Sequence, residues 1–179
     1  MNLTIEQWEE LENNPLWKFF IDVETESSLL GSTLKGHLLI EELMTELLSK
    51  TFIKRSRLKE AKLSFHQKLK LVLALDSGLV SDDLGAILTT LNKIRNDFAH
   101  EIEPLKLDDN LTRFIKQLPK VIVINNKVIE INRNVELNAS DGMNAEFLAK
   151  KRMETAYIQG MKWCVSELFN ITNDYGVNR

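Results

Sequence analysis

Apolar residues in the middle of the chain recur every three or four positions, and this spacing constrains the fold more than any other feature. Ser81 can cap a helix there, with Asp82 and Asp83 in its first turn. Pro104 follows the run, which predicts that the helix ends near Glu101. The apolar positions form a single stripe, made of Leu84, Ile87, Leu88, Leu91, Ile94 and Phe98. A helix with one apolar stripe buries that stripe against other elements.

Further segments show the same helical spacing. They predict helices over residues 4–21 (one or two short helices, with Pro15 beginning or kinking the second), 25–49, 64–76, 107–118 and 143–172. The helix over 25–49 carries an apolar row made of Leu30, Leu34, Leu38, Met44, Leu47 and Leu48. We therefore expect an all-α fold. We expect one domain over 1–179, with an N-terminal helical extension over 1–24.

Residues 121–131 have a different pattern. Two short β-branched runs flank Asn125-Asn126, which predicts two strands around a turn. A lone hairpin is marginally stable in water, so this one must pack on the helices or on another chain. We expect it to form a small insertion over 119–140.

Composition limits the compartment and the cofactors. The chain has 179 residues, a net charge of −3 and one cysteine, Cys164, so no internal disulfide framework can form. Cys164 lies in an apolar helical pattern, which favours a buried packing thiol. No run of 18 apolar residues and no signal-peptide pattern occurs, so we expect a cytoplasmic protein with no membrane span. The three histidines show no ligand spacing with cysteine, so we expect no metal and no other cofactor.

Charge is distributed unevenly along the chain. Residues 50–70 hold eight basic side chains against Glu60, whereas residues 1–26 hold seven acidic side chains against Lys18. One explanation is that the acidic end docks on the basic segment or on a second subunit. The other is that the basic segment attracts a phosphate backbone. The second explanation makes Lys54, Arg55 and Arg57 candidate substrate-binding residues.

His37 and Glu41 interrupt the apolar row of the helix over 25–49. They lie four residues apart, so they share a face and can touch. Polar groups on an apolar row need partners. Either the two side chains satisfy each other or lie in water at the edge of the row, or they line and support a site.

The segment Arg95-Asn96-Asp97-Phe98-Ala99-His100 carries the residues suited to chemistry. Arg95 lies close to the buried stripe, and Asn96 is four residues from His100, so its amide could orient the imidazole. Arg95 and His100 point about 140° apart on one helix. Two copies meeting across a two-fold axis would bring such groups together better than one helix does.

These residue types suit cleavage of RNA. A histidine can take the proton of a 2′-hydroxyl, and an arginine can fork onto the phosphate oxygens as charge develops. The structural alternative is that Arg95 clamps two helices together and that His100 is favoured by the C-terminal helix dipole. Spacing alone favours this alternative.

The order of residues adds a family resemblance. The stretch from Lys68-Leu69-Lys70-Leu71 through Gly78-Leu79-Val80-Ser81 to Ile94–His100 resembles the HEPN superfamily with its Arg-x4-His signature. In particular it resembles the branch that includes the mannitol-operon repressor family. The segment Gly36–Leu43 is similar to the second helix of such proteins, and the resemblance covers most of residues 25–172.

The resemblance implies an up-and-down helical bundle that dimerises through the motif helices. Catalytic HEPN proteins are metal-independent endoribonucleases, often toxins or antiviral defence effectors. Arg95 and His100 match their catalytic pair, and Asn96 matches the polar position that commonly follows the arginine. RNA and an antitoxin would then be partners. Other members, including the mannitol-repressor branch, are non-catalytic regulators that bind proteins. The expected hairpin is not part of the minimal HEPN bundle.

Overall fold

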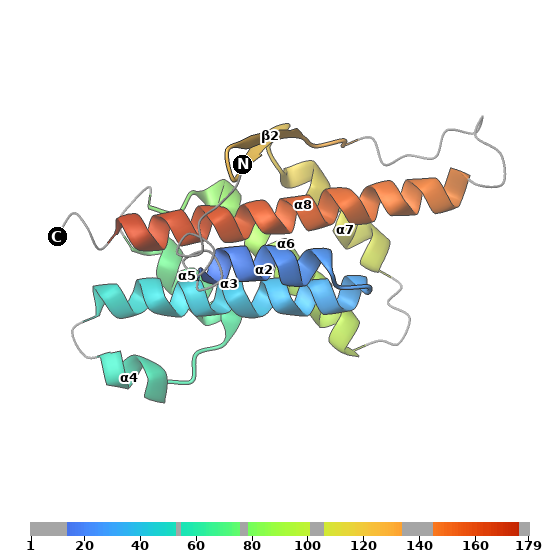
Figure 1. The fold of residues 1–179 in the computed structure, drawn as a ribbon. Coiled ribbons are helices and arrows are strands. Elements are labelled where there is room, and N and C mark those ends of the chain that lie inside the picture. The colour runs from blue at the N-terminus through green and yellow to red at the C-terminus, as the bar shows by residue number, and fades with distance from the viewer. Residues whose placement is uncertain (1–13, 53–54, 76–78, 101–105, 134–144, 176–179) are drawn as a thin grey trace.

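Two long helices, α3 (Leu29–Thr51) and α8 (Ala145–Asp174), lie side by side and form the centre of the protein (Figure 1). The computed structural model describes residues 14–52, 55–75, 79–100, 106–133 and 145–175. The remaining elements are α2 (Pro15–Glu24), α4 (Arg55–Glu60), α5 (Phe65–Leu73), α6 (Asp82–His100), α7 (Leu107–Gln117), β1 (Val121–Ile124) and β2 (Lys127–Glu130). The expectation of a mostly helical fold with one small hairpin is confirmed.

Side-chain caps fix where the helices begin. The Oδ1 of Asn14 accepts a hydrogen bond from the backbone of Leu16 at 2.9 Å, and Pro15 takes the first helical position of α2. Ser64 forms a capping box with Gln67 at the start of α5. The Oγ of Ser81 accepts from the backbone of Leu84, 3.2 Å away, at the start of α6. These caps agree with the helix starts expected at Pro15, Ser64 and Ser81.

The core lies where α3, α6, α7 and α8 meet. Its largest fully buried side chains include Tyr157, Phe114, Ile40, Met44, Leu47, Leu88, Leu91 and Ile94. Helices approach closely at two glycines. A Cβ on Gly36 of α3 would collide with Met161, and a Cβ on Gly160 of α8 would lie 2.8 Å from the Phe114 ring. The backbone at these points has no room for a side chain.

The apolar row expected along α3 is only partly buried. Met44, Leu47 and Leu48 are core residues, but Leu30, Leu34 and Leu38 are 40%, 37% and 64% exposed. The predicted row is therefore buried only in its C-terminal half. The chain before α5 turns toward the C-terminal half of α3, where Leu63 lines a hollow with Thr45. The N-terminal half of α3 therefore receives less cover.

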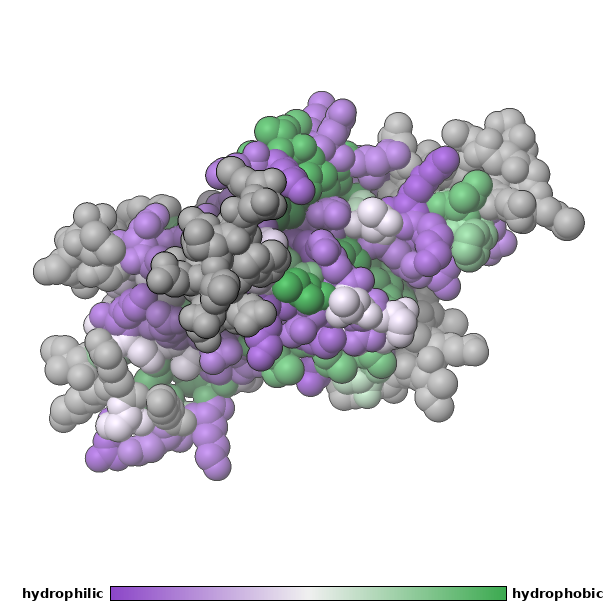
Figure 2. Space-filling view, viewed as in Figure 1, coloured by the Kyte–Doolittle hydropathy of each residue, from purple (hydrophilic) through white to green (hydrophobic). Residues whose placement is uncertain are grey.

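The hairpin packs on the helices. Asn125 and Asn126 have φ values of 49° and 59°, the left-handed pair typical of a two-residue hairpin turn. Val123 pairs with Val128 across the antiparallel ladder. Ile122 and Ile124 are buried, and β1 lies against α8. The opposite face carries exposed valines, seen as a hydrophobic patch at the top of Figure 2 over an otherwise largely hydrophilic surface.

Helix α4 falls inside the basic segment and was not expected as a helix. It contacts α3 and no other helix or strand of the described residues, and it projects from the bundle (Figure 1). Within the described ranges, no helix combines the length and the apolar character needed to cross a membrane.

Candidate functional site

His37 lies in the middle of α3 and is buried against α5 and α6. Its Nε2 is 3.0 Å from Oδ1 of Asn92, and its ring stacks on Phe65 with centroids 4.3 Å apart and planes 22° apart. Because Oδ1 of an amide only accepts hydrogen bonds, Nε2 carries the proton in this contact. His37, Phe65, Asn92 and Arg95 are called the His37–Arg95 cluster below.

Burial lowers the pKa of His37. The positive charge of Arg95 lowers the pKa further, whereas the Asn92 hydrogen bond and the charge of Glu41 raise it. Since the pKa falls below its ordinary value of about 6.5, the ring is mostly neutral at pH 7. Arg95 lies near His37 because Asn92, which contacts His37, precedes Arg95 by one turn of α6.

Glu41 finds its partner on another helix. Its Oε1 accepts a hydrogen bond from Nζ of Lys68 at 2.8 Å, which ties α3 to α5. The expectation that His37 and Glu41 satisfy each other is therefore wrong. The two side chains share a face of α3, but α5 and α6 pack on that face and supply better partners for each. The role of His37 and Glu41 in supporting a site stays a prediction.

Arg95 lies one turn beyond Asn92 on α6 and is half-buried. Its Nη1 donates to Oδ1 of Asn96 at 3.2 Å. Its Nε is shielded from solvent and has no acceptor among the residues that the structure describes. The expectation that Arg95 borders the buried stripe is confirmed. A half-buried guanidinium can donate its other N–H groups to an anionic oxygen.

The amide oxygen of Asn96 is engaged by Arg95. Whether Asn96 also orients His100 lies outside the described residues, because only the backbone of His100 is described. The next motif residue, Asp97, accepts a hydrogen bond from Nδ2 of Asn110 at 2.6 Å, and this contact joins α6 to α7. Sequence analysis assigned no role to Asp97 or Asn110.

Of the candidate substrate-binding residues, only Arg57 has a described side chain, and it is not brought to this cluster. Arg57 forms an exposed ion pair of 2.7 Å with Glu60 on α4, which packs on α3 alone among the described elements. Lys54 lies outside the described residues, and only the backbone of Arg55 is described. The structure therefore gives no geometry for a joint role of these three residues.

The charged segments do not dock on each other in the described part of the chain. In the basic segment, Lys50 pairs with Glu46 and Arg57 with Glu60 on the same helix, whereas Lys68 pairs with Glu41 on another helix. The acidic Glu24 and Glu26 pair instead with Lys162 and Lys35. Four of the seven acidic residues of the N-terminal end lie outside the described residues, so docking of this end on the basic segment or on a second subunit stays a prediction.

Two further chemical groups can be placed. Cys164 is buried, as expected, and burial raises the pKa of its thiol. No set of three or more histidine, cysteine, aspartate or glutamate side chains among the described residues could hold a metal ion.

Asn92 was missed by sequence analysis although a signal was present. It lies three residues before Arg95, so the two share one side of α6. The partner His37 is 55 residues away in the chain, and no local pattern predicts that contact.

Comparison with known proteins finds no matching family model, no matching curated protein and no matching solved structure.

Proposed function

We propose that this protein is a HEPN-type RNA-cleaving homodimer that requires no metal. Arg95 binds the scissile phosphate, His100 acts as general acid or base, and Asn96 positions them. The observation that carries the proposal is the placement of Arg95, which is half-buried at the edge of the core with its Nη1 held by Asn96. A guanidinium held in place in this way is suited to stabilising developing phosphate charge.

The exposed leucines of α3 support a second copy beside the motif helix. Leu34 lies three residues before His37, so both lie toward the same side of α3. Leu30 and Leu38 continue the row at helical spacing, and all three are exposed. An exposed apolar row on α3, a helix that packs against α6, favours an isologous contact that would bring two Arg95 and two His100 residues together.

Cleavage of labelled single-stranded RNA in EDTA tests the proposal. We expect Arg95→Ala and His100→Ala to lose activity, by about 100-fold or more for the general acid or base. Lys93→Ala is the matched control, because Lys93 is exposed on the same helix and stands outside the cluster. The proposal fails if the wild type does not cut, or if His100→Ala cuts as fast as the wild type.

A second candidate is a non-catalytic regulator of the mannitol-repressor type that works by binding another protein. The ion pairs that Lys50, Arg57 and Lys68 form with glutamates favour this candidate, because paired cations attract RNA less strongly. In this case the wild type does not cleave RNA, and Arg95→Ala and His100→Ala weaken dimerisation, which sedimentation experiments measure. Unchanged sedimentation and unchanged partners in pull-down experiments would contradict it.

A further inference from the structure

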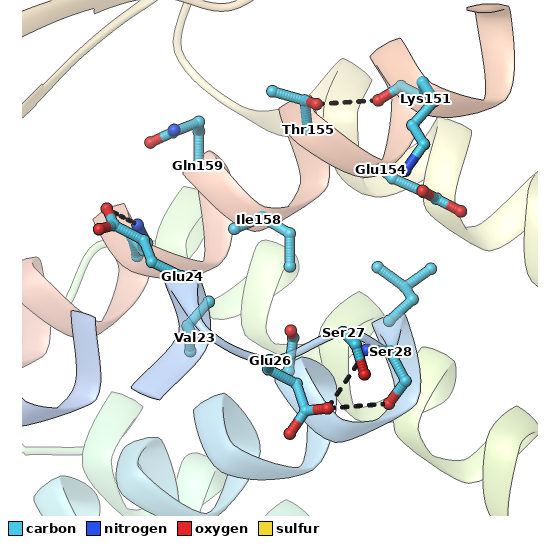
Figure 3. A pocket seen from close by; sticks show the side chains of 13 residues that line it. Val23, Glu24, Glu26, Ser27, Ser28, Lys151, Glu154, Thr155, Ile158 and Gln159 are labelled. Atoms are coloured by element: carbon cyan, nitrogen blue, oxygen red, sulfur yellow. Dashed lines mark hydrogen bonds and ion pairs between the residues drawn. The ribbon is translucent and has the colours of Figure 1, made fainter. Parts of the chain in front are cut away.

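Two hollows flank one ion pair between α2 and α8. The larger has a volume of about 550 Å³ and the smaller about 300 Å³, and both are lined by Glu24, Gln159 and Lys162. Figure 3 shows the smaller hollow, with Glu24 and Gln159 at one end, Ile158 in the middle, and Lys151 and Glu154 at the other end. The Glu24–Lys162 pair therefore forms a shared wall of the two spaces.

The larger hollow has apolar walls from three elements. Trp17, Phe20 and Ile21 come from α2, and Ile124 and Ile129 come from the hairpin. Its volume is in the range of small-molecule sites, which are about 300–1,000 Å³, and its walls are of the apolar and aromatic kind usual in them.

Among the described residues that line this region, only Lys162 has a charged side chain that is buried. Its side chain is 5% exposed, and its Nζ lies 2.7 Å from Glu24 and 5.6 Å from the centre of the Phe20 ring. An ammonium group this deeply buried needs a negative partner. Lys162 is thus a fixed cation in the wall of an apolar space.

Glu24 is a loosely held partner. Its side chain is 69% exposed, so the ion pair and not packing keeps it at Lys162. Glu24 itself can turn out into water, but the buried ammonium then loses its counter-charge and needs another negative group in the same place. Lys162 therefore favours the entry of an anion that replaces Glu24.

The remaining charges distinguish the two hollows. Among described lining residues, the larger one holds Lys127 and Lys162 and no carboxylate besides Glu24. The smaller one adds Glu26 and Glu154 to Glu24. An anion therefore finds a net positive lining only on the side that faces the hairpin.

We propose that the larger hollow binds a small organic carboxylate with an apolar body. The carboxylate replaces Glu24 on Lys162, and the apolar body packs against Trp17, Phe20 and the hairpin isoleucines. Burial of the apolar body excludes water from the new ion pair, which strengthens it relative to the exposed pair with Glu24. This site includes neither Arg95 nor His100, so the binding proposal can be tested independently of RNA cleavage.

Isothermal titration of the full chain with benzoate, octanoate and 2-naphthoate tests the site. We expect saturable one-to-one binding of at least one of them at concentrations up to about 1 mM. The matching neutral amide should bind about tenfold or more weakly, because it cannot replace the charge of Glu24. This comparison uses only the wild-type protein. Failure of all three carboxylates to bind, or equal binding of the amide, overturns the proposal.

Variants then locate the site. Glu24→Gln removes the competing carboxylate and should tighten binding, whereas Lys162→Met should weaken it about tenfold or more. Lys151→Met is the matched control, because Lys151 lines the smaller hollow and not the larger one. Thermal unfolding of each variant checks its fold. Weaker binding by Glu24→Gln, or unchanged binding by a folded Lys162→Met protein, overturns the assignment to Lys162.

Discussion

His37 Nε2 lies 3.0 Å from the amide oxygen of Asn92, so the middle of α3 is joined to the helix that carries the Arg95–His100 motif. Because burial lowers the pKa of His37, the unfolded chain binds its proton more readily than the folded protein does. The free energy of unfolding is then unaffected by this group above the unfolded pKa of about 6.5. It decreases as the pH falls from that value toward the folded pKa.

The first prediction follows from this difference. Between about pH 7.5 and about pH 5.5, the wild type should lose stability in urea unfolding, and His37→Gln should lose less. His66→Gln is the control, because His66 is exposed on α5 and its loss should leave the wild-type decrease in place. An equal decrease in His37→Gln and in the wild type would contradict the assignment.

The second prediction concerns Asp97 and Asn110, whose side chains form a hydrogen bond of 2.6 Å between α6 and α7. We expect each single change to alanine to cost about 1–2 kcal/mol of unfolding free energy, since hydrogen bonds to charged groups stabilise more than neutral ones. The double variant should cost about 1 kcal/mol less than the sum of the two. Denaturant unfolding of the four proteins measures this coupling. Strict additivity would show that the contact contributes nothing.

The third prediction compares two glycines. Gly160→Ala places a Cβ 2.8 Å from the Phe114 ring and against Leu118, which are both fully buried, so we expect a loss of about 1–3 kcal/mol. Gly31→Ala is the matched control, because the three atoms nearest to its new methyl group all belong to the side chain of Glu26. That side chain can move, and alanine favours helix by about 0.5–1 kcal/mol over glycine. Equal melting temperatures for the two variants would contradict the close approach of α7 and α8.

The fourth prediction concerns the thiol of Cys164. Burial raises its pKa, so little reactive thiolate forms near neutral pH and reagents have no path to the sulfur. A disulfide reagent such as dithionitrobenzoate should react with the protein only after denaturation. Rapid reaction in native buffer would show that the α8 core opens readily.

Local signals in the sequence predicted most of the secondary structure. Ser64 and Ser81 cap the helices that they were expected to cap, and Asn125-Asn126 forms the expected turn. These features depend on neighbours within a few residues, which the sequence shows directly. Helix α4 was missed because its six residues carry almost no apolar periodicity.

The candidate site was only partly predictable. The position of Arg95 beside the apolar stripe follows from helical spacing, and the structure agrees. The pairing of His37 with Asn92, and of Glu41 with Lys68, depends on which helices pack on α3. Periodicity gives the face of a helix but not the length over which a neighbour covers it. For the same reason it did not predict the exposure of Leu30, Leu34 and Leu38.

The packing of α3 along α8 has a consequence for synthesis on the ribosome. More than 90 residues separate the end of α3 from the start of α8, so the face of α3 that contacts α8 stays uncovered until α8 leaves the exit tunnel. A nascent chain that stops before residue 145 exposes the apolar side chains that α8 later covers. Such a chain presents the kind of apolar surface that chaperones bind, and its native core can form only once α8 is available.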